Sequence, residues 1–534
     1  MARIPPAGLG RADLLPVEAP RLTRLRDGAL LVEHPGLPDD EANHASVRLG
    51  RELREARLEG LLDAIPGARS LLLLFEPEKL SLQGRAEEIA RAAGREEPEG
   101  EIRLHRIPVV YDGEDLATVG KRSGLGPEEF ARRHAGAAYR VAFVGFAPGF
   151  AYLSGLPPEL AASRLPSPRA RVPRGTVAIG GPWTGIYPSE SPGGWNLIGR
   201  TSVHLFDPRA NPPSRLRAGD RVAFEAARPD ELPPPPAEPA AFEPAGRPLL
   251  RVVSPGLFTS AQGAPRYGLG SFGVPAGGAM DLLSLDLANT LVGNGPGAAA
   301  LEMTLAGPEL ECLEDGVLAV AGAPLDISVE GRPAPFGRSF RARRGERVRC
   351  GRTSGGARAY LAVRGGLERG LPGEATKRIA REEVLAAGVS PVTAEHTRAS
   401  AVPLPSELRL RVVLGPEVDR FPPNEIDRFL HTVWRVSPES DRRGLRLDGR
   451  PLEFSAAAEI SPAGMPPGTI EVPAGGLPIL LGPDGPVTGG YPRIAAVIGA
   501  DLRLLGQARP GDALRFQAVS LHEALLARSR MSLP

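Results

Sequence analysis

The chain has 534 residues, with 64 Lys and Arg against 63 Asp and Glu, which leaves a formal net charge of +1. This length exceeds what one hydrophobic core supports, so we expect roughly two to four domains. The balanced charge argues against a nucleic-acid partner, and the lack of a membrane-length apolar run or an apolar signal core predicts a cytoplasmic protein without a membrane partner.

Residues 1–95 carry the alternating order of a small α/β sandwich. The apolar pattern predicts strands over 29–34 and 70–77, and helices over 44–62 and 81–94. From residue 96 to 226 the pattern changes to short strands between Gly and Pro turns, which predicts a β-barrel or sandwich. One helix, residues 126–136, interrupts these strands, with Pro127 in its first turn.

Residues 227–248 are rich in Pro and polar residues and lack any period, so we expect an extended linker there. The rest of the chain, residues 249–534, is again β-rich and predicts two barrel-like units. It includes a helix near 281–292 with Asp281 as its N-cap, and a surface helix at 522–531. The fold class predicted for the whole chain is therefore mainly β with α+β parts.

Three segments share a Gly followed by Asp or Glu and then alternating apolar residues, at 218–225, 344–351 and 510–517. Each predicts a tight turn that leads into a strand. Related β units, one before the linker and two after it, are the simplest explanation. Gly-Asp turns before strands are common, so chance similarity is the alternative.

Residues 141–208 combine Gly, Pro, aromatic residues and Arg, which is the composition of stiff loops around a small-molecule pocket. Arg169 and Arg171 are candidates to bind an anion, and Gly193 and Gly194 to offer backbone N–H groups to it. Tyr152 and Tyr187 are candidates to stack on a planar ligand. The alternatives are ordinary surface arginines, a hairpin turn and buried barrel aromatics.

A second group of candidates carries titratable chemistry. His134 ends the helix at 126–136 and would suit a proton relay, or would only meet the helix dipole. Asp441 and Arg442 form a charged pair, either catalytic or a solvated ion-pair network. Four residues, Thr488, Gly489, Gly490 and Tyr491, predict either a substrate-facing turn or a plain hairpin turn.

Several residue types are scarce. The only cysteines, Cys312 and Cys350, exclude a disulfide framework, and the scattered histidines predict no metal site. Asn and Gln are also rare, so a position that keeps an amide is a candidate for a structural or functional need, with drift or capping as the alternative. The amides selected on this ground are Asn43, Asn196, Asn289, Asn294, Gln262 and Gln507.

Longer motifs resemble a known family. GFAPGFAYL (145–153), PRARVPRGTVAIGG (168–181) and SPGGWNLIGRT (191–201) are similar to allophanate hydrolase subunit 1, also called the 5-oxoprolinase B subunit or the Kip-type kinase inhibitor. GVPAGGAMD (273–281), SDRRGLRL (440–447) and VTGGYPRIA (487–495) resemble subunit 2, which is the 5-oxoprolinase C subunit. The same pair forms the carboxyltransferase part of urea carboxylase. The resemblance implies cyclophilin-like β-barrels with a small N-terminal α/β domain.

The second half departs from this family at four positions. Gly263 and Pro265 stand where the family has a carboxylate and a glycine, Arg443 where it has Met, and Glu471 where it has Gln. These departures weaken the transfer of residue roles to the second half.

Three functions follow from the resemblance. The first is the B–C component of an ATP-dependent 5-oxoprolinase, which opens 5-oxoproline to L-glutamate together with a LamB/YcsF-type A subunit. The second is a biotin-dependent carboxyltransferase for urea or a related amide, with biotin on a separate carrier. The third is a non-enzymatic regulator of a histidine kinase. ATP, with Mg²⁺, has no identifiable site, because the Gly-Lys at 120–121 lacks phosphate-loop spacing. A homo-oligomer is left open.

Overall fold

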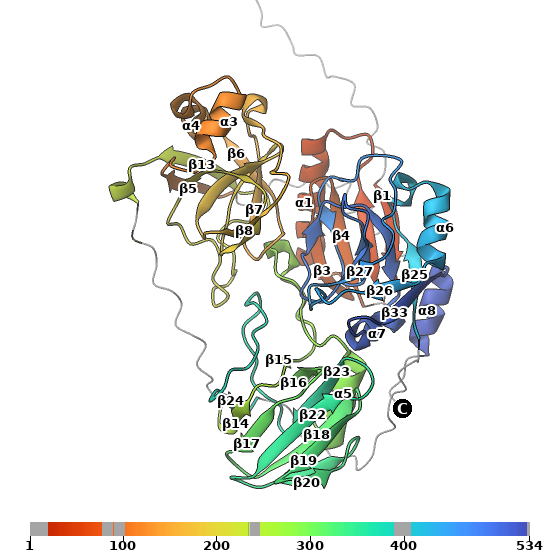
Figure 1. Cartoon of the computed structure of the whole chain (residues 1–534). Helices are drawn as coiled ribbons and strands as arrows, with labels where there is room; N and C mark the ends of the chain where they lie inside the picture. Colours follow the sequence, from red (N-terminus) through yellow and green to blue (C-terminus); the bar gives the residue numbers. More distant parts are fainter. Residues whose placement is uncertain are drawn as a thin grey trace, which may run out of the picture.

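The computed structural model describes residues 20–76, 102–232, 246–388 and 407–530, together with Lys79, Ile89 and Pro234. The helix expected at 81–94 and most of the linker expected at 227–248 lie outside the described residues. The described residues form four parts, and the N-terminal part packs beside the C-terminal one (Figure 1). Within these ranges no helix is both long and apolar enough to cross a membrane.

The N-terminal sheet is antiparallel, with the strand order β1-β2-β4-β3. Leucines of β4 alternate between its two faces: Leu71 and Leu73 pack toward helix α1, whereas Leu72 and Leu74 pack with Val487 of the C-terminal part. The sheet is therefore buried on both sides. Its elements are β1 (Arg21–Arg26), β2 (Ala29–Glu33), α1 (Asp39–Glu55), β3 (Leu61–Pro66) and β4 (Ser70–Phe75).

The helix predicted at 44–62 is wrong at its C-terminal end. Helix α1 ends at Glu55, and Leu61–Pro66 form strand β3. Arg57 takes a left-handed φ of 47°, which ends the helix, and the leucines that follow continue an apolar pattern in a different element. Strand β1 was not predicted.

The first barrel has the strand order β12-β9-β10-β7-β6-β13-β5. Paired N–H···O bonds between Val110 and Arg200, both 2.9 Å, bring its two edges together and nearly close it. The helix predicted at 126–136 is confirmed as α4. The elements are β5 (Leu104–Val109), α3 (Leu116–Arg122), α4 (Pro127–Gly136), β6 (Tyr139–Val144), β7 (Ala151–Ser154), β8 (Arg169–Val172), β9 (Thr176–Gly180), β10 (Trp183–Ile186), β11 (Ser191–Gly193), β12 (Asn196–Arg200) and β13 (Arg221–Ala226), with η2 (Pro158–Leu160) and η3 (Pro229–Glu231).

The third part, green in Figure 1, consists of a six-stranded and a five-stranded sheet that pack around one apolar core. Asp281 caps helix α5 as predicted, because its carboxylate accepts the N–H of Ser284. The elements are β14 (Pro248–Ser254), β15 (Phe258–Gln262), η4 (Gly270–Phe272), α5 (Leu282–Val292), β16 (Ala300–Thr304), β17 (Glu309–Cys312), β18 (Gly316–Gly322), β19 (Leu325–Val329), β20 (Arg332–Ala334), β21 (Ser339–Ala342), β22 (Arg347–Thr353), β23 (Arg358–Val363) and β24 (Val384–Ala386).

The second barrel is closed, in the order β25-β32-β29-β30-β27-β26-β33. Together with the first barrel it confirms the prediction of a mainly β protein with barrels. The predicted C-terminal helix is present as α8. The elements are β25 (Leu408–Leu414), η5 (Val418–Arg420), α6 (Pro423–His431), β26 (Trp434–Val436), β27 (Gly444–Asp448), β28 (Ala463–Gly464), β29 (Thr469–Glu471), β30 (Ile479–Leu481), β31 (Thr488–Gly489), β32 (Arg493–Val497), η6 (Gly499–Asp501), α7 (Leu502–Gln507), β33 (Ala513–Ala518) and α8 (Leu521–Ser529).

The two barrels have the same topology. When strands are matched in chain order, β5 corresponds to β25 and β13 to β33, and each of these first–last pairs is parallel. Each barrel also carries a separate two-stranded hairpin sheet, β8–β11 in the first and β28–β31 in the second. The chain therefore contains one barrel design twice.

Side-chain contacts repeat as well. Tyr139 donates to the backbone oxygen of His134 at 2.8 Å, and Trp434 donates to that of Phe429 at 3.0 Å, both over five residues. His134 stacks on Phe224, with ring centroids 4.8 Å apart, just as Phe429 stacks on Phe516 at 4.5 Å. His134 and Phe429 are therefore equivalent positions.

The three predicted Gly-Asp or Gly-Glu turns are confirmed. Gly219, Gly345 and Gly511 all take a positive φ, between 84° and 99°, and lead into β13, β22 and β33. Only the first and third units share the barrel topology, since β22 pairs antiparallel with both of its neighbours, β17 and β19.

Candidate functional site

The glycine-rich loop of the first barrel meets the hairpin of the second. The side chain of Thr488 in β31 occupies the space where a Cβ on Gly145 would stand, so only glycine fits at residue 145. The N–H of Gly149 donates to the backbone oxygen of Phe272 in the third part, at 2.9 Å. Two of the sequence-predicted segments, 145–153 and 488–491, are thus brought together.

Beside this loop, the outer face of the first barrel carries an aromatic cluster. Tyr152 stacks on Phe143 with ring centroids 4.3 Å apart, and Phe150 meets Tyr187 and Trp195 edge to face. Burial raises the pKa of both Tyr152 and Tyr187 to about 12, so both stay protonated. Both predicted tyrosines lie in this wall, mostly covered by their neighbours.

The two predicted anion-binding arginines are engaged elsewhere. Arg169 pairs with Asp115 at 2.9 Å and with Glu114 at 2.6 Å, and it also reaches the backbone oxygen of Trp195. Arg171 is 75% exposed and pairs with Glu190. Arg169 therefore fixes the β8–β11 hairpin, and Arg171 lies at the surface. Among the described contacts, none joins either residue to Arg442.

The glycines of that hairpin lie close to the aromatic cluster. A Cβ on Gly193 would overlap the Tyr187 hydroxyl, so Gly193 makes room for the phenol. Gly194 faces Leu165 and Pro168. Its carbonyl accepts the N–H of Leu165 at 2.7 Å. These contacts show a packed hairpin, and anion binding by its backbone remains a prediction.

His134 lies inside the first barrel. Its Nδ1 is 2.8 Å from the Tyr111 hydroxyl and its Nε2 is 2.9 Å from Thr184 Oγ1, so both ring nitrogens have partners. Burial lowers the pKa of His134 to about 3, which keeps the ring neutral. With Phe429 at the equivalent position, the geometry favours a packing role. A catalytic role stays a prediction that no described contact supports.

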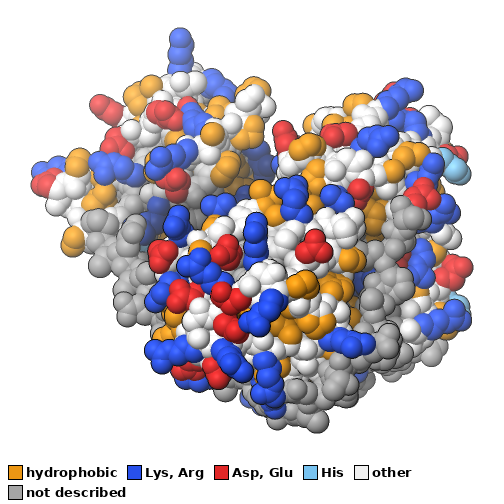
Figure 2. Space-filling view, turned by 60° about the horizontal axis from the view of Figure 1, so that its bottom comes forward, with side chains coloured by type: hydrophobic (Ala, Val, Ile, Leu, Met, Phe, Trp, Pro, Cys, Tyr) orange, Lys and Arg blue, Asp and Glu red, His pale blue; other side chains and the backbone are white. Residues whose placement is uncertain are grey.

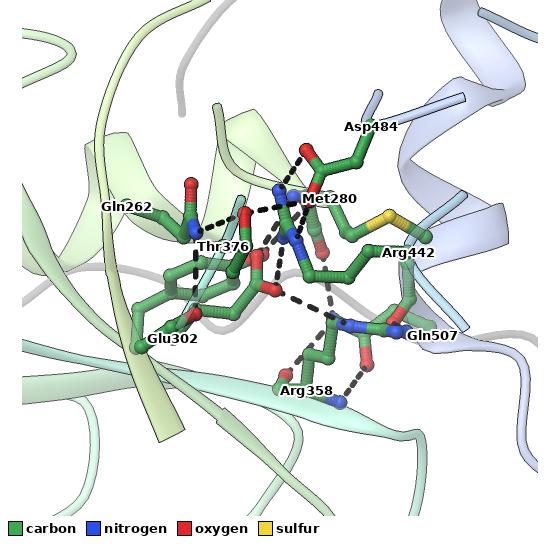
Figure 3. Close-up of polar contacts among 12 residues, drawn as sticks. Gln262, Met280, Glu302, Arg358, Thr376, Arg442, Asp484 and Gln507 are labelled. Atoms are coloured by element: carbon green, nitrogen blue, oxygen red, sulfur yellow. Dashed lines mark hydrogen bonds and ion pairs between the residues drawn. The ribbon is translucent and has the colours of Figure 1, made fainter. Parts of the chain in front are cut away.

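Arg442 joins the second barrel to the third part of the chain. Its guanidinium bonds Glu302 Oε1 at 2.5 Å and both oxygens of Asp484, and it donates to the backbone oxygen of Gly278 (Figure 3). Arg442 is 6% exposed and Glu302 is 1% exposed. Burial acts to raise the pKa of Glu302, but Arg442 and Arg358 outweigh it, and the net shift is downward.

This charged cluster continues on both sides. Tyr360 donates its hydroxyl to Glu302, and Gln507 bonds Asp281 and the backbone oxygen of Arg358 (Figure 3). Because all three guanidinium nitrogens of Arg442 have protein partners, it connects two domains rather than offering a free guanidinium to a substrate. Asp441, by contrast, is exposed, and its Oδ1 accepts the N–H groups of Arg443 and Gly444 in a turn.

The sequence reasoning did not select Glu471 as a site residue. It lies on β29, 6% exposed, and its Oε2 has no hydrogen-bond partner among the described residues. Burial raises the pKa of Glu471 to about 7, and Arg446 only partly offsets this. A Cβ on Gly489 would stand 3.2 Å from Glu471 Oε2, so the predicted turn at 488–491 covers this carboxyl group.

Arg164 was also missed. It is exposed, and its positive charge lowers the pKa of Tyr152 and Tyr187 in the first barrel and of Tyr491 in the second, in each case against a larger effect of burial. The guanidinium is therefore within electrostatic range of tyrosines from both barrels. The signal that would have found Glu471 is an internal match: VPRGTVAIG (172–180) aligns with MPPGTIEVP (465–473), and GGW (193–195) aligns with GGY (489–491).

The surface is hollowed between the two upper lobes in the view of Figure 2. One recess of about 460 Å³ lies around His431 and Arg515, and one of about 340 Å³ lies around Arg174 and Arg200. Neither includes Glu471 or the aromatic cluster. Across the described ranges, no group of three or more His, Cys, Asp or Glu is placed to hold a metal ion.

Comparisons with known proteins match both halves. Residues 20–216 match the family model "Carboxyltransferase domain, subdomain C and D", and residues 272–518 match "Carboxyltransferase domain, subdomain A and B". The chain is 33% identical over 304 residues to the 5-oxoprolinase C subunit of Escherichia coli, covering 52% of this chain and 94% of that protein. It is 36% identical over 224 residues to the 5-oxoprolinase B subunit of Bacillus subtilis, covering 38% and 91%.

Two further similarities extend this result. The crystal structure of TTHA0988 aligns with a TM-score of 0.82 and 37% identity, covering 92% of this chain and 99% of that one. The urea amidolyase of Saccharomyces cerevisiae is 30% identical over 306 residues, which are 51% of this chain but 17% of that protein.

Proposed function

We propose that this chain is the B–C component of an ATP-dependent 5-oxoprolinase. The chain belongs to the family of the 5-oxoprolinase B and C proteins, and it fuses their carboxyltransferase domains in one polypeptide. The reaction opens the lactam of 5-oxoproline and yields L-glutamate. A separate protein, the LamB/YcsF-type A subunit, completes the enzyme. The chain is thus an enzyme component rather than a complete enzyme.

One observation carries this proposal. The segment that resembles the B protein and the segment that resembles the C protein interlock where Thr488 lies against Gly145. The aromatic cluster of Tyr152 and Tyr187 borders this contact from the first barrel, and Tyr491 and Glu471 border it from the second. A small, flat lactam with one carboxylate suits a site with aromatic walls and one arginine, Arg164.

The residues of this chain do not fit a self-contained nucleotide site. The Gly-Lys at 120–121 lies in helix α3 without phosphate-loop spacing, and the described residues form no metal-binding cluster. We therefore assign no step of nucleotide chemistry to this chain. Its own residues would bind and orient the lactam and keep water out until the ring carbon is activated.

Reconstitution tests the proposal. The purified chain alone should show little turnover with ATP and 5-oxo-L-proline. Mixed with the LamB/YcsF-type protein, it should release phosphate and glutamate in equal amounts. Omission of either protein is the control. A mixture that stays silent with 5-oxo-L-proline, while both proteins are folded, would contradict the assignment.

A second candidate function is supported by the same family models. Both halves match carboxyltransferase domains, and one relative is a urea amidolyase. In this function the junction of the barrels would hold a carboxylated biotin, delivered on a separate carrier, beside urea or a related amide. This function would be favoured if the protein consumed a carboxylated biotin carrier only when urea is present and produced no glutamate from 5-oxoproline.

A further inference from the structure

Glu471 is a buried carboxyl group with an unpaired oxygen. It is 6% exposed, and among the described residues no hydrogen bond reaches its Oε2. A buried polar group without a partner costs about 1–3 kcal/mol, so native proteins rarely keep one without a reason. The reason has to be a ligand, a water molecule or a structural need of the fold.

The first barrel argues against a structural need for a carboxyl group at this place. Glu471 follows Gly468 and Thr469, and the equivalent residue after Gly175 and Thr176 is Ala178. The local structure is the same, because Gly468 donates to the backbone oxygen of Leu481 at 2.7 Å and Gly175 donates to that of Tyr187 at 2.8 Å. The same strand therefore forms with alanine at this place.

The surroundings of the two positions differ in a useful way. Ala178 lies beneath Tyr187 and Trp195, which fill the space under the first hairpin. Under the second hairpin, Leu481 and Tyr491 take the equivalent places, and the space next to Gly489 is shared by the Met465 side chain and the Glu471 carboxyl. The second barrel thus has a polar group where the first has an aromatic wall.

The charged and titratable groups around Glu471 come from four segments of the chain. Arg446 on β27 lies in register with it across Ile479 of β30. Tyr491 follows β31, and after burial, the main cause, the negative charges of Glu471 and Glu459 also raise the pKa of its phenol. Arg493 on β32 is committed to Glu417 and to the backbone oxygen of Gly464. Arg164 comes from the first barrel, and its positive charge lowers the pKa of Tyr491, against a larger effect of burial.

We propose that Glu471, Tyr491 and Arg164 form a substrate subsite that takes a planar amide or ureido group on a small molecule that also carries a carboxylate. A protonated carboxyl group offers one donor and one acceptor side by side, which matches the C=O and N–H of a lactam. Tyr491 supplies a flat surface, and Arg164 binds the carboxylate. This inference rests on the proposed function for the choice of 5-oxo-L-proline.

Direct binding to the purified full chain tests the subsite without turnover. Calorimetry should detect 5-oxo-L-proline and, more weakly, 2-pyrrolidinone, which lacks the carboxylate. Glu471→Ala should fold, because Ala178 occupies the equivalent place, and should weaken binding of both at least about tenfold. Glu471→Gln keeps a donor and an acceptor, so it should retain binding and lose its pH dependence between about pH 6 and 8.

Arg164→Ala should weaken binding of 5-oxo-L-proline about tenfold and leave 2-pyrrolidinone unchanged. Arg132→Ala, on the exposed side of α4, is the matched control and should change neither. Unaltered binding in Glu471→Ala, or no measurable binding to the wild-type chain, would overturn the subsite.

The two proposals fail in different ways. Reconstituted turnover that does not depend on Glu471 would leave the proposed function and remove the subsite. Binding that depends on Glu471, without turnover in the presence of the LamB/YcsF-type protein, would leave the subsite and remove the proposed function.

Discussion

His134 and Phe429 occupy the same place in two barrels of the same topology. Each residue lies in the helix that precedes the second strand of its barrel, and each accepts a hydrogen bond at its backbone oxygen from the aromatic residue five positions later. Each ring also stacks on the phenylalanine of the last strand. The two barrels can therefore be compared residue by residue at equivalent positions.

We expect His134→Phe to fold and to keep its activity. The change leaves the Tyr111 hydroxyl without its partner, at a cost of about 1 kcal/mol, whereas His134→Ala opens a cavity and should cost about 2–4 kcal/mol. Urea unfolding and the reconstituted assay measure the two effects. A His134→Phe protein that is stable and inactive would give His134 a catalytic role.

Arg442→Ala should destabilise the chain by about 3 kcal/mol or more, because Glu302 would remain buried with only Arg358 as a cationic partner among the described residues. The activity lost should follow the fraction unfolded. Arg443→Ala is the matched control, since Arg443 is exposed and its side chain has no described partner. If Arg442→Ala stops turnover while its unfolding curve is unchanged, Arg442 contacts the substrate.

The stability of the chain should respond to pH through Glu471. Its pKa is raised to about 7 in the folded state, from an ordinary value of 4.5. The folded state therefore holds this proton more tightly, and its contribution to stability falls as pH rises from about 4.5 to 7. The free energy of unfolding of Glu471→Gln, relative to that of the wild type, should therefore rise by on the order of 3 kcal/mol between pH 5 and pH 8. A stability difference that does not vary with pH would show that Glu471 titrates normally.

Gly145→Ala should disturb the contact between the two halves, because the new methyl group overlaps the Thr488 side chain. Thr488→Ala removes part of that overlap, so the double variant should be more stable than the sum of the single changes predicts, by about 1 kcal/mol. A double-mutant cycle measured by denaturant unfolding shows this coupling. Additive effects would mean that the loop moves away at no cost.

The fold was more accessible to sequence reasoning than the site. Periodicity and Gly-Asp turns identified barrel strands and helices α4, α5 and α8, because these elements obey local rules. Amide scarcity also proved informative: Asn43, for example, bonds the backbone oxygens of Gly67 and Ala142 and accepts from Arg140, so it joins two parts of the chain. All six amides selected are buried.

The site was harder to predict because residue type does not reveal a partner. Arg169 was predicted to bind an anion and Arg442 to be catalytic, yet their charges are paired with Asp115 and Glu302, 54 and 140 positions away. Glu471 was noted only as a departure from the family. Its unpaired oxygen depends on tertiary packing, and only the comparison of the two barrels makes its alanine counterpart visible.

The N–H of Gly499 donates to Asp27 at 2.7 Å, across 472 positions of the chain. If the two halves were cut into separate chains, this bond would form between molecules and the association would weaken on dilution. In a single polypeptide it is an intramolecular closure with a fixed effective concentration. The fraction of the fused protein in which the two halves are in contact therefore does not change with dilution.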